Sequence, residues 1–191
     1  MTVAEAARKA SPSGPQVWPL DVKAYHALGE LGLIPERTEL LYGQIIRKMS
    51  KSPFHSYLHQ SLSELLQAAL PPGTYCRSEQ PLTGHDSEPE PDLAVVRGAR
   101  GDYRHEHPRT AELVIEVCVS SHEYDRSKLR AYASAGVKEC WLVLAPEQQV
   151  EVHLQPQEGQ YTETRLHGPG GSVTSTTVPR FTVDLTRLFA S

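Results

Sequence analysis

Three side chains in the middle of the chain could carry out hydrolytic chemistry. Asp92 begins one short apolar run, Glu116 interrupts a second one, Leu-Val-Ile-Glu-Val, and Lys128 follows in a segment with helical periodicity. Side chains alternate along a strand, so the two carboxylates can face the same side of a hairpin. A carboxylate within an apolar strand is costly to bury unless it is paired, protonated or bound to a cation. The pattern therefore predicts a site where two acids meet a base.

The predicted helix after Glu116 presents further polar groups to the same place. Asp125, Lys128, Leu129 and Tyr132 follow each other at i, i+3, i+4 and i+7, so they form one stripe towards the sheet. Lys128 is then placed to approach Glu116. Alternatives remain open: Glu116 and Lys128 could form a purely structural ion pair, Asp125 could favour the helix start through its dipole, and Tyr132 could be a core residue.

Two neighbouring carboxylates repel each other at neutral pH, and a divalent cation resolves this by taking oxygen ligands from both. Mg²⁺ keeps several waters, so such a site can deliver an activated water to a phosphate. A nearby lysine can position that water or neutralise developing charge. Asp92 and Glu116 are therefore candidate metal ligands for Mg²⁺, with Mn²⁺ as a substitute, and Lys128 completes the equipment for phosphodiester hydrolysis.

Composition indicates one ordinary globular protein. A length of 191 residues fits a single domain, which we assign to residues 18–191, with residues 1–17 as a disordered or loosely ordered tail. The formal charge of −4 argues against binding nucleic acid through bulk positive charge, but not against a local basic groove. Three widely spaced cysteines indicate a reducing compartment. No signal peptide or membrane-spanning run is recognisable, so we expect a cytoplasmic protein without a membrane partner.

Helices and strands mix along the chain in an order that predicts an α/β (α+β) fold. A helix between the strands of Glu116 and Trp141 implies a crossover, so these two strands should be parallel, whereas the remaining ones should be antiparallel. We expect a mixed central sheet flanked by helices, with additional antiparallel strands. The predicted elements are a helix over 19–31, a hairpin over 37–49, a helix starting at residue 53, a strand over 74–82, a strand over 139–145, strands over 149–154, 161–166 and 172–178, and a short helix over 184–190.

At this point the sequence resembles a known family. The segments that carry the resemblance are Glu-Pro-Glu-Pro-Asp-Leu-Ala-Val-Val at 88–96, Leu-Val-Ile-Glu-Val at 113–117, the stretch from Tyr124 to Val143, Glu-Leu-Leu-Tyr-Gly-Gln-Ile-Ile at 39–46 and Pro-Phe-His at 53–55. Their joint occurrence in this order is similar to the bacterial Uma-two family of restriction endonucleases, part of the PD-(D/E)xK nuclease superfamily. The resemblance covers nearly the whole chain from residue 20 onward.

The resemblance implies a restriction-endonuclease-like core in which Asp92 and Glu116 bind the metal. The superfamily lysine usually lies two residues after the glutamate, but this chain has Cys118 there, so Lys128 on the next helix becomes the candidate. Glu39 and His55 match family positions beside the site and are expected to support it. The resemblance further implies DNA as the substrate and, because enzymes of this fold often cut one strand per subunit, a homodimer.

Two histidines, a glycine-rich run and a basic loop are further candidates for a role near these residues. His55 and His59 are spaced i, i+4 as in zinc sites, but no third ligand is evident nearby, so we expect a cap or support role for His55 and a solvated face for His59. The glycine-rich run 168–171 lacks the strand-to-helix setting of a phosphate-binding loop, and we expect no organic cofactor.

A basic loop could bind along a phosphate backbone, or it could simply be solvated. Its arginines are Arg97, Arg100, Arg104 and Arg109.

Departures from the family pattern keep a second function open. Val119-Ser120-Ser121 stands where the family usually reads Ser-Pro-Ser, and Leu144 stands where an aspartate often ends the strand. A domain that keeps the nuclease fold but binds DNA or a protein partner without cutting is therefore the alternative to an active endonuclease.

Overall fold

A computed structural model describes residues 16–120 and 122–190 of the chain. Most of the predicted tail, residues 1–15, lies outside this described part. The helices are α1 (Val22–Glu30), α2 (Pro53–Ala69), α3 (His122–Ser134) and α4 (Leu185–Leu188), with a 3-10 turn η1 at Arg100–Tyr103. The strands are β1 (Thr38–Leu41), β2 (Gln44–Arg47), β3 (Thr74–Ser78), β4 (Leu93–Arg97), β5 (Leu113–Cys118), β6 (Glu139–Leu144), β7 (Gln149–Gln157), β8 (Gln160–His167), β9 (Ser172–Thr174) and β10 (Thr182–Asp184).

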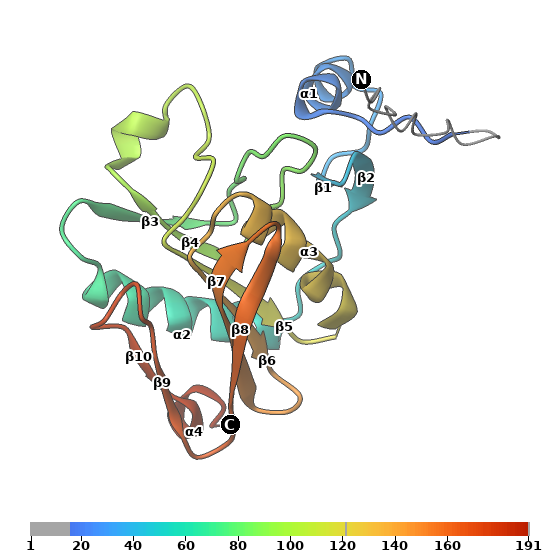
Figure 1. Ribbon diagram of the computed structural model, residues 1–191. Helices are drawn as coiled ribbons and strands as arrows, with labels where there is room; N and C mark the ends of the chain where they lie inside the picture. Colours follow the sequence, from blue (N-terminus) through green and yellow to red (C-terminus); the bar gives the residue numbers. More distant parts are fainter. Residues whose placement is uncertain (1–15, 121, 191) are drawn as a thin grey trace, which may run out of the picture.

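A six-stranded mixed sheet in the order β3-β4-β5-β6-β7-β8 forms the centre of the molecule (Figure 1). Only β5 and β6 pair in parallel within it, and α3 connects them; the other neighbours are antiparallel. The hairpins β1–β2 and β9–β10 stand apart from this sheet at opposite ends of the molecule. The predicted mixed sheet, flanking helices, parallel crossover and additional antiparallel strands are confirmed.

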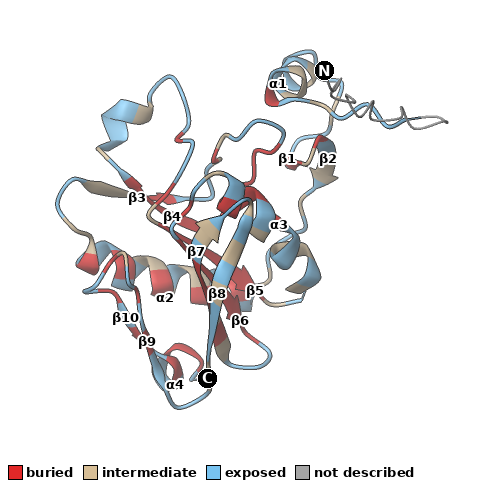
Figure 2. Cartoon of the chain, in the orientation of Figure 1, coloured by how far each residue is buried: buried red, intermediate tan, exposed pale blue. Residues whose placement is uncertain are grey.

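Alternation along the strands divides the buried side chains between two layers. One cluster joins α2 and the β9–β10–α4 unit to one face of the sheet through residues such as Leu62, Ile115 and Trp141. The other joins α3 to the opposite face through Tyr132, Val114 and others. The central strands β4, β5 and β6 are buried almost throughout, whereas the edge strand β8 is largely exposed (Figure 2). Because both faces are covered, β5 and β6 can be almost wholly apolar.

Local sequence signals set the two elements that border the site. The β1–β2 hairpin turns at Tyr42 and Gly43, whose φ angles of 53° and 74° are the left-handed values that a tight hairpin turn requires. Helix α2 begins at Pro53, and its Ser52 cap accepts a hydrogen bond from the backbone N–H of His55 at 3.1 Å. The sequence predicts both features correctly.

Several predicted boundaries are too wide. The strand expected over 74–82 ends at Ser78, because Glu79 has a φ of 52° and leaves the extended conformation. The strand expected over 172–178 ends at Thr174, and its partner β10 was not predicted. The first helix is shorter than 19–31, and the last shorter than 184–190. Among the described helices, none combines the length and the apolar character needed to cross a membrane.

Candidate active site

Asp92 and Glu116 meet where β4 begins and β5 approaches its end. The register pairs Leu93 with Ile115, so continuing it places Asp92 opposite Glu116. The backbone N–H of Asp92 lies 3.4 Å from Glu116 Oε2, and the N–H of Val117 donates to Asp92 Oδ2 at 2.8 Å. Both acids are buried. The structure thus brings them together as the sequence predicts, while their role as metal ligands stays a prediction.

Lys128 reaches the same place from helix α3. Its Nζ lies 3.2 Å from Glu116 Oε1 and 3.3 Å from Glu39 Oε1, and only 5% of the residue is exposed. The hydroxyl of Tyr132, one turn further along α3, donates to Glu116 Oε1, and the hydroxyl of Tyr124 donates to Glu39 Oε1. One lysine and two tyrosines of a single helix therefore hold the two glutamates.

Asp92 has partners on its other side as well. His55 Nε2 lies 3.1 Å from Asp92 Oδ2, and Lys51 Nζ donates to Asp92 Oδ1 at 2.7 Å. His59, predicted to face solvent, instead places Nε2 3.1 Å from the carbonyl oxygen of Asp92 and 2.9 Å from Ser78 Oγ. That prediction is wrong because α2 packs against the start of β4, so its i and i+4 histidines both point to the chain at Asp92.

The environment separates the proton affinities of the two acids. Burial acts to raise the pKa of Asp92, but the hydrogen bond from His55 and the charge of Lys51 hold it well below its usual range. Burial raises the pKa of Glu116 to about 8, because the attraction of Lys128 does not compensate for it and Asp92 adds repulsion. Burial alone would lower the pKa of Lys128, but Glu116 and Glu39 outweigh this and raise it well above its ordinary value. Lys128 is therefore charged at neutral pH.

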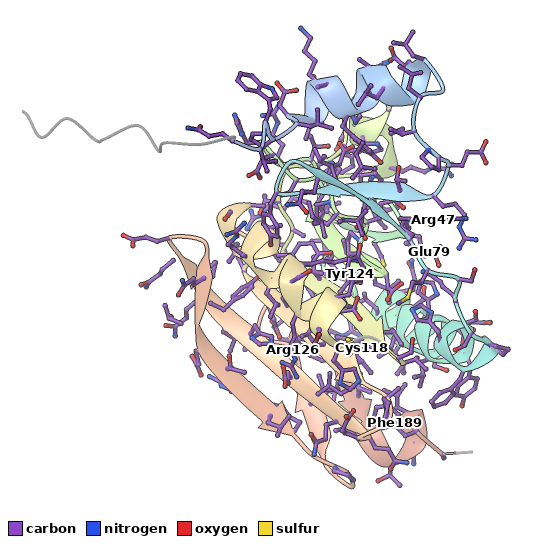
Figure 3. All side chains as sticks on the ribbon, turned by 90° about the vertical axis from the view of Figure 1, so that its right-hand side faces the viewer. Arg47, Glu79, Cys118, Tyr124, Arg126 and Phe189 are labelled. Carbon is purple, nitrogen blue, oxygen red and sulfur yellow. The ribbon has the colours of Figure 1, made fainter. Side chains whose placement is uncertain are left out.

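These groups line a cavity of about 170 Å³ that is open to solvent. Its wall contains six carboxyl side chains and three lysines. Figure 3 looks onto this side of the molecule, with Tyr124 on α3 and Glu79 just after β3 labelled. The carboxyl groups are Glu39, Glu79, Glu90, Asp92, Glu116 and Asp125, and the lysines are Lys48, Lys51 and Lys128. An excess of acids around a cavity favours a cation as its occupant.

The donor set fits a hydrated Mg²⁺ better than zinc. Among the described residues, no three His, Cys, Asp or Glu side chains are arranged to hold a metal ion together. Zinc usually requires three or four protein ligands, whereas Mg²⁺ is commonly held by one or two carboxylates and keeps its waters. Asp92 Oδ1 and Glu116 Oε2 each accept a single hydrogen bond, so each retains acceptor capacity. Two carboxylates with one free position each match that requirement.

The remaining predicted residues divide into those at the site and those away from it. Asp125 lines the cavity, and burial raises its pKa.

The basic loop that contains the four arginines begins at the end of β4 that is distant from the site, roughly 16 Å of extended chain from Asp92. Arg97 is exposed and pairs there with Glu112 at 2.6 Å. The structure therefore does not bring the loop arginines to the site, and DNA binding by Arg97, Arg100, Arg104 and Arg109 stays a prediction.

Sequence reasoning missed several residues that line the cavity, among them Lys51, Glu79 and Tyr124. Lys51 and Glu79 form an ion pair at 2.8 Å beside Asp92, and Tyr124 holds Glu39. Tyr124 could have been found, since it lies one turn before Lys128 on the same predicted helix. Lys51 and Glu79 lie in irregular segments, where no periodicity indicates which way a side chain points.

Comparison with known proteins agrees with this architecture. No functionally curated protein matches the chain significantly. A solved structure from Anabaena variabilis ATCC 29413, described as "a putative nuclease belonging to DUF820", superimposes with a TM-score of 0.72 at 21% identity, covering 85% of this chain and 97% of that one. At this identity the likeness establishes the fold. The model of the Uma2 family, described as "Putative restriction endonuclease", matches residues 25–186. A match over so much of the sequence shows that the chain belongs to the Uma2 family.

Proposed function

We propose that this protein is a metal-dependent endonuclease that hydrolyses phosphodiester bonds of DNA. The observation that carries the proposal is the convergence of Asp92, Glu116 and Lys128 in one acidic cavity open to solvent. Membership of the Uma2 family and the fold shared with a structure described as a nuclease support the same reaction class. The proposal includes a cytoplasmic location, because a DNA substrate would be accessible there.

Asp92 and Glu116 would hold Mg²⁺, for which Mn²⁺ could substitute. The bound ion supplies a water of lowered pKa and neutralises charge on the phosphate. His55, Lys51 and the N–H of Val117 fix the orientation of Asp92, so its free lone pair is preorganised. Tyr132 does the same for Glu116. These contacts support a preorganised site, in which Asp92 and Glu116 need little rearrangement to bind the ion.

Lys128 would orient the attacking water. Its ammonium carries three N–H donors, of which Glu39 and Glu116 take two. The third has no hydrogen-bond partner among the described residues, and Lys128 lines the cavity. A charged donor in this place can hold a water near the phosphate and stabilise negative charge as it develops. Many enzymes of similar fold work as dimers in which each subunit cuts one strand, and by this analogy we include a homodimer in the proposal.

Plasmid cleavage tests the proposal. Supercoiled DNA should be nicked or linearised in Mg²⁺ or Mn²⁺ and left intact in EDTA. The Asp92→Asn variant should be inactive, whereas Glu163→Gln should cleave like the wild type, because Glu163 lies on β8, is partly exposed and pairs with Gln155 on β7 and Arg165 on β8. Cleavage that survives Asp92→Asn would indicate contamination or another site. Metal-independent DNA binding without cleavage would favour the alternative of an inactive nuclease-fold domain.

The raised pKa of Glu116 predicts that cation binding depends on pH. Below pH 8 the Glu116 carboxyl carries a proton that the cation must displace, so the apparent Mn²⁺ affinity should rise about tenfold per pH unit between pH 6 and pH 8 and level off above it. Calorimetry at pH 7 in buffers of different ionisation enthalpy should show release of about one proton per bound ion. Glu116→Gln should bind weakly and lose this dependence. A constant affinity across pH 6–8 would show that the cation displaces no proton from Glu116, and weak binding by Glu116→Gln would then remain the test of Glu116 as a ligand.

A further inference from the structure

Lys51 occupies a bridging position between two carboxylates at the mouth of the cavity. Its Nζ lies 2.7 Å from Asp92 Oδ1 and 2.8 Å from Glu79 Oε1, both lengths typical of charge-assisted hydrogen bonds. The side chain is 28% exposed and lines the cavity. It comes from the segment between β2 and α2, just before the Ser52 cap, whereas Lys128 approaches from α3. The two lysines therefore bracket the pair of acids from different elements.

Glu79 is built into this arrangement by its backbone. Its N–H donates to the carbonyl oxygen of Asp92 at 3.1 Å, and its φ of 52° is an unfavourable value for a residue with a side chain. Strained backbone of this kind persists where surrounding contacts enforce it, often at functional sites. His59 Nε2 lies 4.0 Å from Glu79 Oε1 and also contacts the same carbonyl of Asp92. The Glu79 carboxylate is thus held beside Asp92 by Lys51, although 46% of its side chain is exposed.

Charge determines what such a pair requires. Asp92 and Glu79 would repel each other without a cation between them, and each has a carboxylate oxygen directed at the Lys51 ammonium. A divalent ion with two carboxylate ligands and several waters meets the same need. Two-metal sites for phosphoryl chemistry place a second ion close to the first, with a shared carboxylate. Asp92 is the carboxylate that both positions would share.

From this geometry we infer that Lys51 acts as a built-in second cation: its ammonium fills the position between Asp92 and Glu79, so that the site takes one divalent ion, between Asp92 and Glu116. The inference rests on the proposed function for that first ion. It assigns Lys51 and Glu79 as residues that set the metal stoichiometry, and it predicts that removing the amine opens a second divalent-ion position.

Counting bound Mn²⁺ by electron paramagnetic resonance tests the inference without reference to activity. The titration is done on the full chain at pH 8.5, with the same buffer for every variant. The wild type should bind about one ion and Lys51→Ala about two, while Lys51→Arg should keep about one. Lys48→Ala, which removes the same charge from the same cavity but beside Glu90, should also keep about one. The double variant Lys51→Ala/Glu79→Gln should return to about one.

The number of bound ions distinguishes a failure of the Lys51 inference from a failure of the proposed function. One ion in both the wild type and Lys51→Ala, or two in the wild type, would overturn the inference and leave the metal-dependent nuclease intact. Two ions in Lys48→Ala would overturn it as well, because bulk charge rather than position would then be responsible. No ion in either protein would overturn both proposals. One ion in Lys51→Ala and none in the wild type would also overturn the inference, because Lys51 would then compete with the first ion for Asp92 Oδ1 instead of filling a second position.

Discussion

At pH 9, where the Glu116 carboxyl is largely ionised, replacing Lys128 with methionine is expected to destabilise the protein by about 3–5 kcal/mol, because removing one partner of a buried ion pair leaves the other charge uncompensated. Here a single amine serves two buried acids, Glu116 and Glu39, so the loss should lie at the upper end of this range. The rate of plasmid cleavage should fall by about two to four orders of magnitude, as expected when a positioned proton donor or orienting group is removed.

Chemical denaturation over a range of pH distinguishes this cause from a simple packing defect. The uncompensated acids of the Lys128→Met variant can take up protons, and the pKa of Glu116 is already raised to about 8, so much of the lost stability should return as the pH is lowered from 9 to 7. Lys138→Met is a suitable control, because Lys138 is half exposed and pairs with Glu112 at 2.7 Å on the surface. A surface pair contributes about 0–1 kcal/mol. A loss of less than about 1 kcal/mol in Lys128→Met would show that the buried acids do not depend on its charge.

The part of the site that lies on regular elements follows from the sequence alone. Strand alternation places Asp92 and Glu116 on one side, and helical spacing places Lys128 and Tyr132 opposite them; the structure has both arrangements. These periodicities are fixed by the geometry of strand and helix. The same holds for the parallel pairing of β5 and β6, since a crossover helix between two buried strands leaves little choice.

The part of the site that lies on irregular chain does not follow. Lys51 precedes a helix cap, and Glu79 follows a strand that ends early, so neither has a periodic neighbour that indicates its direction. Their meeting at Asp92 depends on where α2 packs against the sheet, which involves residues far apart in sequence. The prediction that His59 faces solvent is wrong for the same reason. Helical spacing indicates the side of α2 on which His59 lies, but not which element covers that side.

The contacts of Glu139 also depend on the tertiary structure, and they predict a large effect of its substitution on the free energy of unfolding. It opens β6, is fully buried, and accepts six hydrogen bonds. Trp141 Nε1 donates to Oε1 at 2.7 Å, and the loop 175–177 supplies the five donors to Oε2. The indole of Trp141 also stacks on Phe181, at 5.0 Å between ring centroids. Glu139 thereby ties the β9–β10 hairpin to the end of the sheet.

Substituting Glu139 with alanine should lower the free energy of unfolding by about 3–5 kcal/mol, because buried donors lose a charged acceptor and gain none. Glu139→Gln should recover little of this loss: its amide nitrogen would face donors on whichever side it points, since both oxygens of the native carboxylate accept hydrogen bonds. Urea denaturation measures the effect, and faster amide hydrogen exchange at Thr176 and Thr177 would locate it. Glu163→Ala, on exposed β8, should change stability by less than about 1 kcal/mol. If Glu139→Gln matched the wild type, the loop would be held by packing around Trp141 and Phe181 rather than by the carboxylate.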